Sequence, residues 1–516
     1  MTVFGPRTGR AGSRAYALGF FLLCSAAGIE PLAAQDDAEG ARRSCVSISL
    51  PPDHWVGPAL LRMQAAGALG SYLAIQRSVP LCTAHEELLR AAAELEDARV
   101  ADLATNLLVR LEREFPALRS FRADEGSGQV ISASLSGQVT ERNGVGGPGR
   151  AEFEPDRTGV EAIEDLRRLQ MEADLGLFAN DRLAFRAVPV VDRDRVWFET
   201  LEGVVGLGPI ALTVGRGMVG YGTATSGGIV LDQGRFDRIQ LETPRSLRSP
   251  GILRPLGRFT FSTFAARLRE ERHANKPLFW GASASIQPHW RTTFSVHRGA
   301  MIRVDGTEFP ITLRNVLSLL VGDVGGGGFE NQIVSVEGRF HLPTEAVLPL
   351  TAYMEWGAED AAGAWWAVPA RVIGVQVPYL PGFAGASGGV ERSSFAPSCC
   401  GNPKWYRHWS FPGAWASADA PLGHPIGGQG TEWLAYAGLD LAGSASRVDV
   451  EAFHRTRAGE NLFIPGREGS SWGMKSALRW QIGGRPEIFG SLDVERGRGW
   501  REHRLDLGGR ITMGSQ

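Results

Sequence analysis

Apolar and polar residues alternate along most of the chain from about residue 127 to its end. Trp433 and Ala435 fall on one side of this alternation, and Glu432 and Tyr436 fall on the other. Successive side chains of a β-strand point to opposite faces, so the period predicts strands with one apolar and one polar face. The same period recurs in residues 209–216, 447–455, 478–482 and 504–513.

A transmembrane barrel accounts for this pattern better than a soluble antiparallel protein. Charged residues stand in the middle of the strands, which suits a wet lumen better than a hidden core. Residues 127–516, at about twenty residues per strand and connection, give about 18 strands, within the porin range. A parallel β-helix needs a short fixed repeat, which we do not find in the sequence. We therefore predict a mainly β fold in which residues 123–516 form an outer-membrane antiparallel β-barrel.

A helical period precedes the barrel. Trp55, Leu60 and Met63 can share one face of a helix that starts near Gly57, with Asp53 as a candidate N-cap. A second amphipathic stretch has apolar residues three or four positions apart, namely Leu88, Ala92, Leu95, Leu103, Leu107, Leu111 and Phe115. Residues 35–122 are thus expected to form a small α-helical head whose apolar stripe must pack against another surface.

The first 34 residues have the layout of a secretory signal peptide. Arg7, Arg10 and Arg14 precede the apolar run 15–23, and small residues follow up to Ala34, after which cleavage is expected. Cys24 lies within this removed segment, with a lipid anchor on Cys24 as the alternative. No later segment has the roughly 18 uncharged apolar residues of a membrane helix.

Composition narrows the class of protein further. Glycine contributes 66 of 516 residues, which suits a chain with many turns. Lys and Arg total 54 against 56 acidic residues, so no overall basic field favours nucleic acid as a partner. As an outer-membrane barrel, the chain is expected to have outer-membrane lipid as a partner and to act as a monomer.

Four cysteines follow the expected cleavage site, in a compartment where disulfides persist. Cys45 and Cys82 flank the first predicted helix and could staple it. Cys399 and Cys400 are adjacent, and we interpret them as an oxidised pair that stiffens a loop. A metal site formed by this pair with His408 is the alternative, but three such residues alone do not define one. We expect no metal and no cofactor.

Long connections supply the candidate binding residues. The longest runs from about Pro378 to Thr431, and others span residues 142–159 and 322–328. Aromatic rings can stack on sugar rings, and cations can bind acidic groups, so the candidate glycan-binding residues combine both: Lys404, Trp405, Tyr406, Arg407 and Trp409. Trp365 and Trp366 are a second candidate, with an interfacial aromatic girdle as the alternative.

A catalytic arrangement is not evident. Ser226 lacks the preceding glycine of a nucleophile elbow. Ser295 and His297 are two apart, a spacing that arises by chance. Glu359 and Asp360 are adjacent on an expected strand and would point apart, which does not suit paired carboxyls for glycoside cleavage. We therefore expect a protein without enzymatic activity.

The order of several motifs resembles the Wzi family of capsule-assembly outer-membrane proteins. The motifs run through almost the whole chain after the signal peptide and are residues 53–60, 214–217, 221–222, 227–231, 277–282, 331–332, 353–356 and 359–360. The resemblance implies an 18-stranded outer-membrane barrel in which residues 35–122 form a periplasmic helical head, acting as a lectin that holds capsular or extracellular polysaccharide at the cell surface. It also implies a barrel closed by the head on one side and by folded loops on the other. Tyr221 stands where the family leads us to expect Trp, and the chain ends without a terminal aromatic residue.

A different class of function remains open beside this one. A substrate-specific porin could use luminal arginines, such as Arg216, Arg479 and Arg510, to steer anionic solutes or oligosaccharides through an open pore. The two hypotheses differ in whether the lumen is open.

Overall fold

The computed structural model describes residues 46–514 apart from 70–72, 74–76, 96, 117, 119–128, 146–165, 180–181, 193–194, 270–272, 274–275, 303–329, 346, 360–368, 397–404, 409–410, 412, 418–419, 442–445, 460, 463–466 and 483–485. The helices are α2 (Val56–Ala65), α3 (Leu81–Glu94), α4 (Ala98–Glu114) and the 3-10 helix η5 (Gly251–Leu256). The first strands are β1 (Gln129–Val145), β2 (Leu166–Ala179), β3 (Leu183–Asp192), β4 (Arg195–Leu207), β5 (Ile210–Val219), β6 (Gly234–Glu242), β7 (Leu247–Arg248), β8 (Arg258–Arg267), β9 (Leu278–His289) and β10 (Thr292–Ile302). The remaining strands are β11 (Glu330–His341), β12 (Thr351–Glu359), β13 (Ala370–Val377), β14 (Ala386–Phe395), β15 (Ala416–Ser417), β16 (Ala420–Pro421), β17 (Gly430–Asp440), β18 (Arg447–Arg457), β19 (Gly469–Gln481), β20 (Pro486–Gly497) and β21 (Trp500–Gly514).

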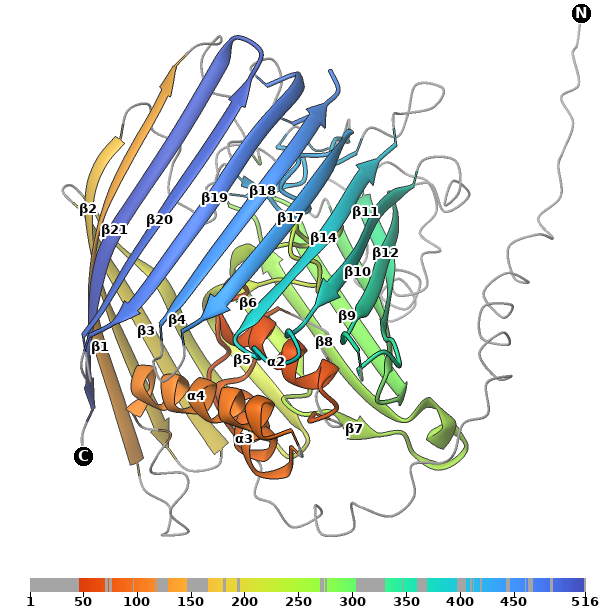
Figure 1. Ribbon diagram of the computed structural model, residues 1–516. Helices are drawn as coiled ribbons and strands as arrows, with labels where there is room; N and C mark the ends of the chain where they lie inside the picture. Colours follow the sequence, from red (N-terminus) through yellow and green to blue (C-terminus); the bar gives the residue numbers. More distant parts are fainter. Residues whose placement is uncertain are drawn as a thin grey trace, which may run out of the picture.

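The strands form a closed antiparallel ring (Figure 1). Each wall strand pairs with the next wall strand along the chain. Where short strands intervene in the sequence, β6 pairs with β8 and β14 pairs with β17. The last strand, β21, pairs with β1 from Ser132 and Gly514 to Val145 and Arg501, which closes the ring. One of the 19 strands in this sheet, β7, is a two-residue piece beside β8, so eighteen form the wall. The prediction of a mainly β barrel of about 18 strands with N-terminal helices is confirmed.

The two faces of the wall differ as the alternation predicts. On β17, Trp433 is 50% exposed, whereas its neighbours Glu432 and Leu434 are buried. Exposed apolar side chains cover the outside of many strands, including Val214, Ile239, Val296, Val390, Val450, Leu478, Ile488 and Leu507. The inside carries many buried polar and charged side chains. An apolar exterior around a polar interior is the arrangement of a barrel that crosses a bilayer.

Arg216 lies on the outer face of β5, so the prediction that it lines the lumen is wrong. It has the same parity as the exposed Val214, and its guanidinium Nε binds Asp237 Oδ1 of β6 at 2.7 Å. The cross-strand aspartate compensates the charge of the outward arginine. Arg479, by contrast, alternates with the exposed Leu478 and Trp480 and therefore points inward.

The helical head follows the predicted period with one difference. The first helix, α2, begins at Val56, beside the predicted start at Gly57. The second predicted stretch is divided into α3 and α4 because Leu95 is extended and Asp97 caps a new helix, its carboxylate accepting from the Arg99 N–H at 2.9 Å. None of the described helices is long and apolar enough to cross a membrane.

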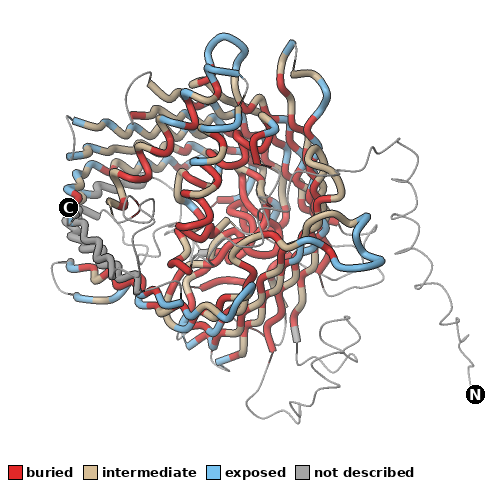
Figure 2. The backbone as a smooth tube through the Cα atoms, turned by 90° about the horizontal axis from the view of Figure 1, so that it is seen from below, coloured by how far each residue is buried: buried red, intermediate tan, exposed pale blue. Residues whose placement is uncertain are grey.

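The helices pack into the barrel at the end where the C-terminus lies (Figure 1). Seen from that end, buried segments occupy much of the space inside the ring of strands (Figure 2). Buried residues of the helices, such as Leu60 and Leu107, form one apolar cluster with Ala184, Val204 and Ala211 of the wall. The apolar stripe of the head is therefore covered by the inner face of the barrel.

The long predicted connection from Pro378 to Thr431 contains a wall strand, β14, so that prediction is wrong in extent. β14 pairs with β17 from Ala386 to Phe395 and with β13 from Gly388 to Phe395. Its sequence includes Gly388 and Gly389, which carry no side chain to mark the alternation. The wall pairing is set by its two neighbours.

Candidate functional site

The connection between β5 and β6, residues 220–233, folds into the barrel and is called the inner loop. Its ends meet where Tyr221 N donates to Leu231 O at 2.7 Å. Backbone approach is close at Gly228, because a Cβ atom there would lie 2.3 Å from Tyr221 O. The glycine motif of the sequence therefore marks a tightly folded turn, and most side chains of this loop are buried.

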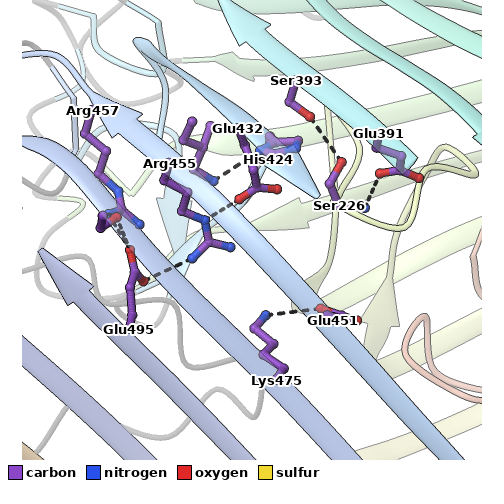
Figure 3. Close-up of polar contacts among 12 residues, drawn as sticks. Ser226, Glu391, Ser393, His424, Glu432, Glu451, Arg455, Arg457, Lys475 and Glu495 are labelled. Carbon is purple, nitrogen blue, oxygen red and sulfur yellow. Dashed lines mark hydrogen bonds and ion pairs between the residues drawn. The ribbon is translucent and has the colours of Figure 1, made fainter. Parts of the chain in front are cut away.

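Buried glutamates of the wall hold the inner loop. The Glu391 carboxylate accepts hydrogen bonds from Thr225 N and Ser226 N, each at 2.6 Å (Figure 3 shows the contact with Ser226). Glu355 accepts from Ile229 N at 3.1 Å, and Thr223 binds Glu337. Each carboxylate satisfies backbone or hydroxyl donors that would otherwise be buried without a partner. The inner loop is thus fixed to three neighbouring regions of the wall.

The described part of the connection between β14 and β17, residues 405–408, 411, 413–417 and 420–429, is called the long loop. Its aromatic residues bind the inner loop, with Tyr406 Oη donating to Ile229 O at 2.7 Å and Trp415 Nε1 to Val230 O at 2.8 Å. Asp232 N also donates to Leu422 O at 2.7 Å. These contacts place the long loop against the inner loop inside the barrel.

The predicted glycan-binding residues occupy different positions in this arrangement. Trp405 and Tyr406 are fully buried, and burial raises the pKa of Tyr406 well above 10. Tyr406 N donates to Glu359 Oε2 at 2.7 Å, and the Trp405 ring meets Phe395 edge-on with centroids 5.2 Å apart. Arg407 is partly exposed and donates to Asn461 O at 3.2 Å. The other predicted residues, Lys404, Trp409, Trp365 and Trp366, lie outside the described residues. A role of this segment in glycan binding stays a prediction.

Of the four cysteines in the disulfide predictions, one is among the described residues. Cys82, at the start of α3, is disulfide-bonded. Cys45, Cys399 and Cys400 lie outside the described residues, so the pairing of Cys45 with Cys82 stays a prediction.

The hydroxyl and acidic residues considered for catalysis have structural partners. Ser226 Oγ lies 3.1 Å from Ser393 Oγ, and His297 Nδ1 lies 2.7 Å from Ser283 Oγ (Figure 3 shows the serine pair). Ser295 pairs with Ser285 at 2.5 Å, so it does not form a dyad with His297. Glu359 anchors the long loop as described above. Within the described residues, no group of three or more His, Cys, Asp or Glu is placed to hold a metal ion.

A buried charged cluster lies beside the loops, on β17, β18 and β20. Arg455 binds Glu432, and its Nη1 lies 3.1 Å from Glu495 Oε2 (Figure 3). Arg457 Nη1 lies 2.8 Å from Glu495 Oε1, which also accepts from Ser471 Oγ at 2.7 Å. The alternation of residues placed Glu432 on the polar face of its strand but did not connect it with Arg455, Arg457 or Glu495. All four residues occupy inward-facing positions near the ends of neighbouring strands. This shared position is the signal that could have identified them.

The helical head is held in the opposite end of the barrel by its own ion pairs. Arg62 of α2 binds Asp440 Oδ2 of β17 at 2.5 Å and donates to Pro378 O at 2.8 Å. Arg510 of β21 binds Glu114 Oε1 of α4 at 2.6 Å. The predicted luminal arginine Arg510 is therefore engaged by a carboxylate of the head.

Two titratable groups of the head have shifted pKa values. Burial lowers the pKa of His54 below 6.5, against the opposing effect of the adjacent Glu114. Burial alone would raise the pKa of Glu114, but His54 and Arg510 hold it well below 4.5. Glu114 also accepts from Trp55 Nε1 at 2.8 Å. The head is thus docked through an ionised carboxylate.

Comparison with known proteins gives a family and a fold. The family described as capsule assembly protein Wzi matches residues 119–501. Among solved structures, the barrel fold is shared with Escherichia coli Wzi, described as an outer-membrane protein involved in group 1 capsule assembly and a carbohydrate-binding β-barrel; the TM-score is 0.70 at 14% identity, covering 91% of this chain and 100% of that one. Pseudomonas aeruginosa OpdL has a TM-score of 0.46 at 13% identity, covering 75% of this chain and 99% of that one. No curated protein sequence matches the chain.

Proposed function

Since the chain belongs to the Wzi family of capsule assembly proteins, we propose that it is a non-enzymatic outer-membrane protein that attaches capsular or extracellular polysaccharide to the cell surface. The observation that carries the proposal is the filling of the barrel by the inner loop, the long loop and the head. A channel needs a continuous aqueous path, whereas here buried ion pairs and backbone hydrogen bonds tie these segments across the interior. This arrangement supports a binding protein rather than a porin.

The glycan is proposed to bind at the end of the barrel opposite the head, on the long loop and its neighbours. Residues 404–409, together with Trp365 and Trp366, are the proposed contact region. Trp405 and Tyr406 would hold its shape, because both are buried, and Arg407 would offer a cation to an acidic sugar. The proposed location follows from the head, which enters the barrel from the other end and would face the periplasm.

The test is the fate of polysaccharide in a deletion strain. Cells that lack the protein should release polysaccharide into the medium and retain less of it, and the wild-type chain should restore retention. An Arg407→Ala chain should restore it less well than an Arg254→Ala control, which changes an exposed arginine in η5 at the other end of the barrel. Normal retention in the deletion strain would remove the proposal.

A conductance measurement separates this proposal from the porin hypothesis. The pure wild-type protein in a planar bilayer should show no steady unitary current. Steady current from the wild-type protein would favour the porin.

A further inference from the structure

A row of cationic and aromatic side chains crosses the outer face of the wall near the end opposite the head. The cross-strand register places Arg392 of β14 opposite Trp433 of β17, and Trp433 opposite His454 of β18. The row continues through Trp472 of β19 to Arg496 of β20 and Arg501 of β21, each directly opposite the one before. At about 4.8 Å per strand, these six strands span roughly 24 Å. We call this set the outer row.

The outer row faces outward and is well exposed. Trp472 is 69% exposed and Trp433 is 50% exposed, whereas Phe453 and Arg455, which flank His454, are buried. The His454 and Trp472 rings are 4.3 Å apart, and the Arg392 guanidinium lies 5.2 Å from the centre of the Trp433 ring. Within the outer row, a guanidinium therefore lies over one indole ring, and a second indole ring contacts an imidazole.

The rows on either side show where the outer row stands along the strands. The row nearer the head is apolar up to β20, with Val390, Ala435, Ala452, Met474 and Val494 in register. The row on the other side carries hydroxyl groups at Ser394, Thr431, Thr456 and Ser470. The outer row thus lies where the apolar surface gives way to a polar one, the position of the interfacial girdle in membrane barrels.

The arginines of the outer row have no acidic neighbours to compensate them. Within the described residues, Arg392, Arg496 and Arg501 form no ion pair. The acidic neighbours along β20 and β21, Glu495 and Glu502, take the opposite parity and bind arginines inside the barrel. The outward arginines of β5 and β6 are different, because Arg216 binds Asp237 and Arg235 binds Glu199. In contrast to that sector, the outer row presents guanidinium groups that have no acidic partner among the described residues.

We propose that the outer row binds the phosphorylated saccharide headgroup of a lipid in the outer leaflet. Guanidinium groups form paired hydrogen bonds with phosphate, indole rings can stack on sugar rings, and the hydroxyl row can bind sugar hydroxyls. Because the strands are tilted and β19, β20 and β21 rise beyond β14, the row climbs along the wall (Figure 1). A headgroup of phosphates and sugars, which extends away from the bilayer, matches this rise better than a short phospholipid headgroup does. The proposal rests on the proposed outer-membrane location.

The test is lipid binding by the purified full-length protein in detergent, measured by native mass spectrometry. The probes are lipopolysaccharide, the same lipopolysaccharide after dephosphorylation, and polygalacturonate as a lipid-free acidic polysaccharide. The variant Arg392→Ser/Arg496→Ser/Arg501→Ser should bind lipopolysaccharide about tenfold more weakly than the wild type, and dephosphorylation should weaken wild-type binding similarly. Arg216→Ser, which removes an outward arginine that has an acidic partner, should bind as the wild type does.

Two outcomes would overturn the proposal: lipopolysaccharide binding that the triple substitution leaves unchanged, and a loss confined to polygalacturonate, which would assign the row to a free polysaccharide. If the triple variant does not fold, Arg496→Ser alone should still reduce binding a few-fold, and no reduction would again count against the proposal. The lipid-binding assay contains no capsule. A failure of the polysaccharide-retention test would therefore not change the result of the lipid-binding assay.

Discussion

Arg510 of the last strand binds Glu114 of helix α4 at 2.6 Å, although 396 residues separate them in the chain. The contact joins the strand that closes the barrel to the helical head inside it. Together with the pair between Arg62 and Asp440, it makes the head part of the barrel interior. The function of the head can therefore be tested by breaking these two pairs.

Loss of the head contacts should open the barrel. Arg62→Ala leaves Asp440 with Arg447 as its remaining partner and removes the hydrogen bond to Pro378 O, at a cost of about 3 kcal/mol in docking free energy. The Arg62→Ala/Arg510→Ala variant should show unitary currents in planar bilayers and faster proteolysis within residues 46–118. Arg254→Ala, far from these contacts, should remain silent. A silent double variant would show that the head does not close the lumen.

The conformation of the inner loop should depend on the absence of a side chain at Gly228. Alanine there would place a Cβ atom 2.3 Å from Tyr221 O, so the backbone of the loop must move. We expect Gly228→Ala to lower the temperature at which the folded gel mobility is lost and to speed hydrogen exchange at residues 225–231. Gly203→Ala in β4 is the matched control, because its Cβ atom meets nothing within 4 Å. Equal behaviour of the two variants would contradict the proposed packing of the inner loop.

The buried charged cluster should contribute far more to stability than a partly exposed pair on the same strands. Glu495→Gln removes the charge that Arg457 binds and leaves Arg455 with Glu432 as its acidic partner, and breaking a buried pair typically costs about 3–5 kcal/mol. Glu451→Gln breaks the pair with Lys475, in which Lys475 Nζ lies 3.9 Å from Glu451 Oε2 and both side chains are about one-quarter exposed. This substitution should cost less than about 1 kcal/mol. Urea unfolding in detergent or lipid gives both values. Equal losses would mean that the cluster is no more buried in solution than the control pair.

The alternation along the strands was sufficient to predict the barrel, but not its contents. Trp433 and Glu432 are on the faces that the alternation predicts, because successive side chains of a wall strand point to the outside and to the inside of the barrel in turn. Trp405 and Tyr406 carry no such signal. Their burial depends on the inner loop, and Tyr406 binds Ile229 across 177 positions of the chain. A cluster of aromatic and cationic residues in a loop fits a surface site and an internal packing contact equally well, and only the tertiary arrangement distinguishes the two.

The docking of the head should weaken in acid. The pKa of His54 is lowered by burial from 6.5, so the undocked head binds a proton more readily, and docking loses free energy as the pH falls below about 6.5. The pKa of Glu114 is held well below 4.5, so its stabilising effect is complete above about pH 4.5 and is lost as the pH falls through its docked value. Both shifts have the same sign, so proteolysis of the head with an acid-tolerant protease should be slow at pH 7.5, faster near pH 5.5 and faster still near pH 4. His54→Gln removes the first of these two steps, since glutamine does not titrate, and reduces the second, because His54 contributes with Arg510 to the lowered pKa of Glu114. A His54→Gln profile with the same change between pH 7.5 and 5.5 as the wild type would assign that step to another group.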